Sequence, residues 1–167
     1  MSANRIPCLI LACGNSLRGD DGVGPWLAQW ASGRFRAESL VRVLASQQWA
    51  PEMAEEIAGA KAVIFIDSSM ESAPGAVKLA QVQPATGDAA LSTHHLGAAE
   101  LLGLGCELYG YLPRTALLLT VGIETTALRE EFSDAVKASL PEACNLLEHA
   151  VQRLLTGAEL WASVHRV

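Results

Sequence analysis

Four side chains suited to a metal site or to acid–base chemistry are spaced along the sequence. Asp20 and Asp21 lie in a glycine-rich loop, Asp67 ends an apolar run, and His94 follows Ser92-Thr93. Loops that follow parallel strands meet at one edge of a sheet, so these residues are expected to gather there. Two carboxylates and one imidazole would form an incomplete ligand set with open positions, which nickel, zinc, iron or manganese could use.

Each of these residues also has an ordinary structural interpretation. An Asp-Asp-Gly sequence is most often a turn that caps a helix, so we expect one of the adjacent carboxylates to tie down the loop and the other to face the crevice. An acid at the end of a buried strand often only accepts loop amide hydrogen bonds. His94, or the neighbouring His95, can simply begin a helix.

Two other kinds of site fit the sequence less well. The loop 14–24 contains neither a G-x-G-x-x-G pattern nor a P-loop lysine, and its adjacent carboxylates would repel a phosphate from a helix N-terminus. This disfavours a nucleotide-binding or oxidoreductase domain. Candidate nucleophiles are present at Cys13, Ser16, Ser68 and Ser69, but no G-x-S-x-G elbow accompanies them.

Apolar runs alternate with helical patterns and predict the elements that position these residues. Strands are expected at 6–12, 40–45, 62–66, 76–82 and 115–121, the fourth as a hairpin partner of the third. Helices are expected after Gly22, from Pro51 through Ile57, over 95–104, and from a capping box at 139–142 onward. This order predicts an α/β fold: a doubly wound, mostly parallel five-stranded sheet with helices on both faces.

The composition restricts the kind of protein further. A chain of 167 residues predicts a single domain over 1–167, with 157–167 as a loose tail. The net charge of −6, with 12 scattered basic residues, argues against nucleic acid as a partner. The longest early apolar run ends after eight residues, at Cys13, so neither a signal peptide nor a membrane span is expected. Four cysteines without a C-x-x-C pair favour a reducing cytoplasm.

Several of these motifs, in this order, resemble those of the hydrogenase maturation proteases. The loop from Gly14 to Pro25, which reads GNSLRGDDGVGP, resembles their N-terminal signature, and Ile64-Phe65-Ile66-Asp67 resembles their strand that ends in an acid. Pro74-Gly75, Ser92-Thr93-His94 and Val121-Gly122-Ile123-Glu124 resemble the turn, the histidine segment and the late strand that follow. The resemblance extends over nearly the whole chain, from Ile6 to Leu155.

The resemblance implies a doubly wound fold and an endopeptidase that removes the C-terminal extension of a nickel-iron hydrogenase large-subunit precursor. It implies that Asp21, Asp67 and His94 engage a nickel ion supplied by the substrate, and that Asp20 has a structural role. No tightly bound cofactor of its own is expected, and the free protein is expected to be a monomer. Asp21 or Asp67 could be the general base, or the nickel could polarise the scissile carbonyl.

One loop departs from the family pattern. Where the family often has Asp-Gly-Gly-Thr or Asp-Gly-Gly-Ser after the second strand, this chain reads Ala45-Ser46-Gln47-Gln48-Trp49. The departure leaves open which hydrogenase is processed. A non-catalytic nickel-binding checkpoint protein on the same fold is the alternative function.

Overall fold

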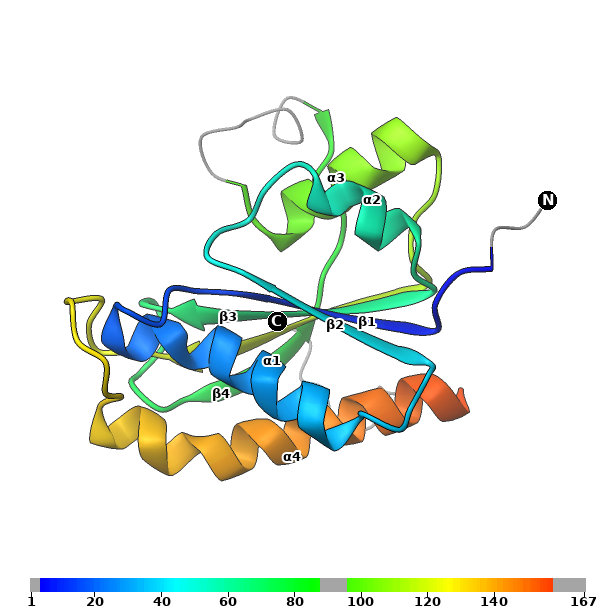
Figure 1. Cartoon of the computed structure of the whole chain (residues 1–167). Coiled ribbons are helices and arrows are strands. Elements are labelled where there is room, and N and C mark those ends of the chain that lie inside the picture. Colours follow the sequence, from blue (N-terminus) through cyan, green and yellow to red (C-terminus); the bar gives the residue numbers. More distant parts are fainter. Residues whose placement is uncertain (1–3, 88–95, 158–167) are drawn as a thin grey trace.

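The computed structural model describes residues 4–87 and 96–157, in which strands and helices alternate along the chain (Figure 1). The elements are β1 (Cys8–Cys13), the 3-10 turn η1 (Gly19–Gly22), α1 (Val23–Arg34), β2 (Val41–Ser46), α2 (Met53–Ala58), β3 (Ala62–Ser69), β4 (Val77–Gln81), α3 (Ala98–Tyr109), β5 (Thr115–Gly122) and α4 (Asp134–Thr156). No helix within these ranges is long and apolar enough to cross a bilayer. The predicted tail, apart from Gly157, lies outside the described residues, and the single-domain organisation stays a prediction.

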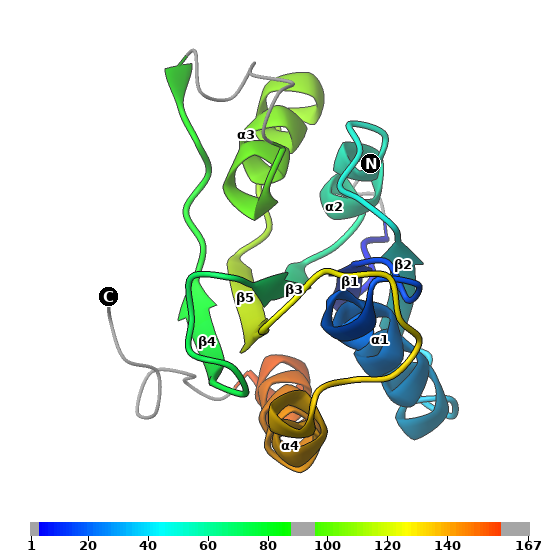
Figure 2. The same cartoon turned by 90° about the vertical axis from the view of Figure 1, so that its left-hand side faces the viewer.

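The five strands form one sheet in the order β2-β1-β3-β5-β4. The first four strands in this order are parallel, and β4 runs antiparallel to β5 at one edge. Helices α2 and α3 cover one face, and α1 and α4 cover the other (Figures 1 and 2). The predicted mostly parallel, doubly wound α/β fold is therefore confirmed.

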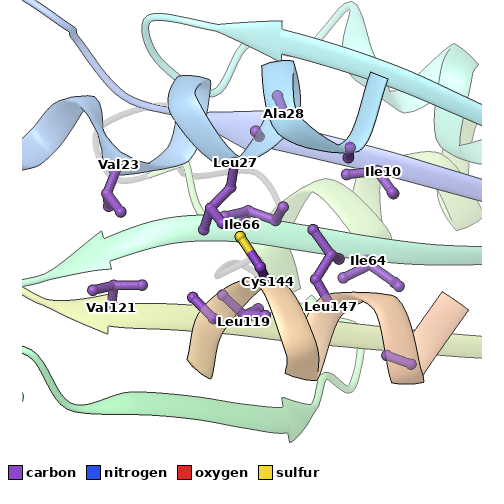
Figure 3. Packing of buried hydrophobic residues seen from close by; sticks show 14 of the residues in the cluster. Ile10, Val23, Leu27, Ala28, Ile64, Ile66, Leu119, Val121, Cys144 and Leu147 are labelled. Atoms are coloured by element: carbon purple, nitrogen blue, oxygen red, sulfur yellow. The ribbon is translucent and has the colours of Figure 1, made fainter. Parts of the chain in front are cut away.

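Side chains alternate between two apolar cores, one on each face of the sheet. In β1, Ile10 packs into the core beneath α1 and α4, whereas Leu9 and Leu11 pack into the core beneath α2 and α3. Figure 3 shows Leu27 of α1 and Leu147 of α4 meeting the strand side chains of the first core. Because both faces are covered, the central strands read as continuous apolar runs in the sequence.

Two strand assignments were wrong in detail. Strand β3 does not end at Asp67 but continues to Ser69, because β5 pairs with it through Ser69↔Gly122. The strand predicted over 76–82 is β4, and its partner is β5 rather than β3. The turn at Pro74-Gly75 leads the chain past the end of β5, where Gly75 donates its backbone N–H to the Gly122 carbonyl.

The third helix also differs from its predicted range, because tertiary packing outweighs local propensity. It begins at Ala98, where the Glu100 carboxylate accepts the Gly97 N–H at 3.1 Å, so the N-cap is not supplied by 92–94. It continues past Gly103 and Gly105 to Tyr109 and ends at Gly110, which has a left-handed conformation. Gly105 faces α2, and a Cβ built there would lie 3.5 Å from the Ala54 carbonyl oxygen.

The last helix begins earlier than its predicted start near Ser139. Its N-cap is Ser133, whose hydroxyl accepts the Val136 N–H at 3.3 Å. Ser139 lies inside the helix and donates its hydroxyl to the Val136 carbonyl at 2.7 Å, and Pro141 also lies inside. Pro141 and Lys137, whose carbonyl loses its helical donor, are both exposed, which lowers the cost of the proline.

Candidate functional site

The loop after β1 folds tightly onto the end of that strand. A Cβ built at Gly24 would lie 2.1 Å from the Cys13 carbonyl oxygen, so only glycine lets α1 approach β1 this closely. Gly14 has a φ of 152°, and a Cβ there would lie 2.1 Å from the Asp21 carbonyl oxygen. These two contacts fix the turn that carries the aspartate pair to the carboxyl edge of the sheet, which faces the viewer in Figure 2.

Asp20 is fully buried, and donors of the protein itself bind its carboxylate. It accepts the Ser133 N–H at 2.6 Å, the Ser133 hydroxyl at 2.8 Å and the Glu124 N–H at 3.2 Å. It therefore joins the loop after β1 to the loop after β5 and to the start of α4. These bonds agree with the structural role that the resemblance implies.

Asp21 is only partly buried and turns toward β3. One of its carboxylate oxygens accepts the Asn15 N–H at 2.9 Å, and the other accepts the Ser68 hydroxyl at 2.7 Å. The adjacent aspartates therefore diverge, as the sequence predicts. The Asp20 carboxylate is bound by donors in the interior of the protein, and the Asp21 carboxylate lies at the sheet edge.

Asp67 lies on β3, and Ser68 links it to Asp21. One Asp67 oxygen accepts the Ser68 N–H at 2.8 Å, and the other accepts the Trp49 indole N–H at 3.0 Å. Ser68 thus donates to both carboxylates, with its hydroxyl to Asp21 and its amide to Asp67. Two of the three residues predicted to engage a metal are therefore brought together, whereas His94 and His95 lie outside the described residues.

Burial sets the electrostatics of Asp67. It raises the pKa of the carboxyl from 3.8 to about 6, while the hydrogen bonds from Trp49 and Ser68 lower the pKa and the negative charge of Asp21 raises it. The carboxyl can therefore exchange a proton close to neutral pH. That property suits a general base.

The candidate nucleophiles find less support. Burial, followed by the negative charges of Asp67 and Asp21, raises the pKa of the Cys13 thiol to about 12, so this cysteine stays protonated. The Ser68 hydroxyl donates to Asp21. Ranges 4–87 and 96–157 contain one histidine, His149, and it hydrogen bonds with Arg153 on α4, far from Ser68 in the chain.

Carboxylate oxygens are the donors this edge offers to a cation. In the part of the chain that the structure describes, no three His, Cys, Asp or Glu side chains are grouped closely enough to hold a metal ion. Asp21 and Asp67 supply a pair, which suits a metal that brings further ligands with it.

Trp49 is the site residue that the sequence interpretation missed. Its ring packs edge-on against Phe65, with the centroids 5.6 Å apart. The indole N–H nevertheless reaches Asp67 from the loop after β2. The available signal was its place in that loop, next to the strand end that carries the acidic residues.

The comparisons with known proteins bear on this arrangement. No protein-family model matches the sequence, and no curated protein matches it. Among solved structures, the hydrogenase maturating endopeptidase HybD from E. coli superposes with a TM-score of 0.69 at 20% identity, over 87% of this chain and 92% of that one. This likeness concerns the fold.

Two archaeal structures are nearer in sequence. The NiFe hydrogenase maturation protease HybD from Thermococcus kodakarensis is 28% identical, with a TM-score of 0.62 over 86% of this chain and 97% of that one. HycI, a NiFe hydrogenase maturation protease from Thermococcus kodakarensis KOD1, is 25% identical, with a TM-score of 0.63 over 92% and 94%. The chain is therefore similar in fold and in sequence to solved hydrogenase maturation proteases.

This similarity draws attention to the loop after β2. It is the loop that departs from the Asp-Gly-Gly-Thr pattern of hydrogenase maturation proteases, and in this chain its Trp49 donates to Asp67. The departure therefore reaches one of the two paired carboxylates directly.

Proposed function

We propose that this maturation protease removes the C-terminal extension of a nickel-iron hydrogenase large-subunit precursor by hydrolysing one peptide bond. The observation that carries the proposal is the pair of carboxylates, Asp21 and Asp67, joined through Ser68 at the carboxyl edge of the sheet. In open α/β sheets this edge is where ligands bind. The similarity to solved hydrogenase maturation proteases supports the reaction class.

In this proposal, Asp21, Asp67 and His94 engage the nickel that the precursor already holds. The protease owns no metal, so cleavage waits until the substrate is loaded. Such an ion, held beside the scissile bond, would polarise the carbonyl. The expectations of a cytoplasmic monomer that neither enters a membrane nor binds nucleic acid belong to the same proposal.

In the alternative in which a carboxylate is the general base instead of a nickel ligand, Asp67 is the better candidate. A carboxyl whose pKa is raised to about 6 is largely ionised at pH 7, yet holds a proton more tightly than an ordinary aspartate. It can take a proton from an attacking water and return it to the leaving amine. Asp21 remains the second carboxylate of the pair.

The proposal is tested by the intact mass of a nickel-loaded precursor after incubation with this protein. Nickel-free precursor is incubated in parallel, together with Asp21→Asn and His94→Ala variants. Glu71→Gln is the matched control, because it also removes a carboxylate charge beyond β3 but at an exposed position outside the pair. Circular dichroism checks that each variant is folded.

The expected result is loss of one discrete C-terminal peptide, only from nickel-loaded precursor and only with the wild type and the Glu71→Gln control. Binding of the precursor without any change of mass, with the cognate precursor of the same genome, would contradict the proposal. That outcome would instead support a non-catalytic checkpoint protein.

A further inference from the structure

The hydrogen bonds of the two paired carboxylates follow one pattern. Among the described residues, each of the four oxygens of Asp21 and Asp67 accepts one hydrogen bond, and each carboxylate has one backbone donor and one side-chain donor. The backbone N–H groups of Asn15 and Ser68 are donors that the fold supplies whatever the side chains at these positions. The Ser68 hydroxyl and the Trp49 indole N–H are side-chain donors, so they depend on the residue type.

This pattern fixes the orientation of the two carboxylates and still leaves lone pairs on their oxygens for other partners. An ionised carboxylate oxygen offers about two lone-pair positions, so one hydrogen bond on each leaves room for one further partner. Two bonds on opposite oxygens prevent rotation of the carboxylate plane. Ser68 also fixes the two carboxylates relative to each other, since its hydroxyl and amide belong to one residue of β3.

Both side-chain donors are themselves held. Ser68 lies within β3 and pairs with Val121 of β5, so its backbone position is set by the sheet. The Trp49 ring packs edge-on against Phe65, a fully buried residue of β3. The loop after β2 thus reaches to β3, although β1 lies between these strands in the sheet.

We infer that Ser68 and Trp49 are positioning residues, which hold the Asp21 and Asp67 carboxylates at a fixed mutual orientation for the substrate. This inference rests on the proposed peptidase function. Neither residue needs to touch the substrate, because each acts through a carboxylate. Partners that orient the ligands of a metal typically change activity or affinity by about 10- to 100-fold when they are removed.

Three substitutions separate positioning from general structural damage. Ser68→Ala removes the hydroxyl, whereas Ser68→Thr keeps it on a residue that strands favour. Trp49→Phe keeps an aromatic ring against Phe65 and lacks the indole N–H, and the melting temperature reports the effect of the smaller ring. Ser69→Ala is the matched control, because its hydroxyl has no hydrogen bond among the described residues and it lies one position further along β3.

The experiment measures kcat and KM for cleavage of nickel-loaded precursor, together with the melting temperature of each variant. Ser68→Ala and Trp49→Phe are expected to lower kcat about 10- to 100-fold with little change in KM or melting temperature. Ser68→Thr should restore most of the rate, and Ser69→Ala should match the wild type.

The other outcomes have different meanings. If the wild type cleaves and Ser68→Ala and Trp49→Phe cleave at the same rate, the positioning inference is overturned while the peptidase function stands. A loss of rate that Ser68→Thr fails to restore, or that Ser69→Ala shares, also overturns it. If the wild type leaves the precursor unchanged, the proposed function fails and the inference falls with it.

Discussion

Replacement of Asp67 by asparagine should make the protein more stable at neutral pH, because the ionised carboxylate is held at an unfavourable place. Burial raises its pKa from 3.8 to about 6 in the folded protein. A difference of one in pKa corresponds to about 1.4 kcal/mol, so ionised Asp67 lowers the free energy of unfolding by about 3 kcal/mol. Asparagine has the same shape and cannot ionise.

The direction of the pH dependence follows from the raised pKa. Well below pH 3.8, Asp67 is protonated in both the folded and the unfolded chain, and its ionisation costs nothing. As the pH rises, the unfolded chain ionises first, so the wild type loses stability until the pH passes about 6. The asparagine amide leaves either Trp49 or Ser68 without its acceptor, which offsets about 1 kcal/mol of the gain.

The assay is urea unfolding of the wild type and of Asp67→Asn, without metal, at several pH values between 4 and 8. The difference in unfolding free energy between the two proteins isolates Asp67 from all other titrating groups. It should change in favour of the variant by about 2.4 kcal/mol between pH 4 and pH 7.5, because the unfolded chain is already partly ionised at pH 4. A difference for Asp67→Asn that stays flat, or grows toward acid, would refute the reasoning.

Three further predictions concern the residues that support the site. Gly24→Ala should destabilise the protein by about 3 kcal/mol in urea unfolding, because its Cβ would lie 2.1 Å from the Cys13 carbonyl oxygen. In the same helix Gly33→Ala, which meets nothing within 4 Å, should stabilise it by up to about 1 kcal/mol. Asp20→Ala should cost about 3 to 5 kcal/mol by the same measurement, since it leaves three donors without their acceptor; a cost under 1 kcal/mol would contradict its structural role. Iodoacetamide at pH 8 should label exposed Cys106 in the folded protein and leave buried Cys13, with its pKa near 12, unlabelled until urea is added, as peptide mass mapping would show.

The sheet and the position of the acidic residues could be predicted because both depend on local patterns. The apolar runs of β1 and β3 are long enough to identify buried strands, and glycine and proline mark the turns between elements. Once the strands are parallel, the loops that follow them share an edge. This rule alone brings Asp21 and Asp67 together, as observed.

The details that the sequence did not predict depend on contacts between distant residues. The start of α4 lies at Ser133 because that residue binds Asp20, 113 positions earlier, and the local capping-box pattern near Ser139 gave the wrong start. Likewise, β3 extends to Ser69 because β5 pairs with it there. The hydrogen bond of Trp49 to Asp67 requires the strand order of the sheet, which no local pattern contains.

Asp20 and Asp21 have different roles in the loop, and their surroundings explain the difference. Asp20 is completely buried, so it is tolerable as a charge only because three donors neutralise its oxygens. Those donors come from the loop after β5 and the start of α4, so Asp20 locks the turn in which Asp21 lies. Asp21 needs only two donors because it is partly exposed, and its remaining lone pairs stay available. If the roles were exchanged, the Asp21 carboxylate would be buried with too few donors. This is why Asp20 is the structural residue of the pair.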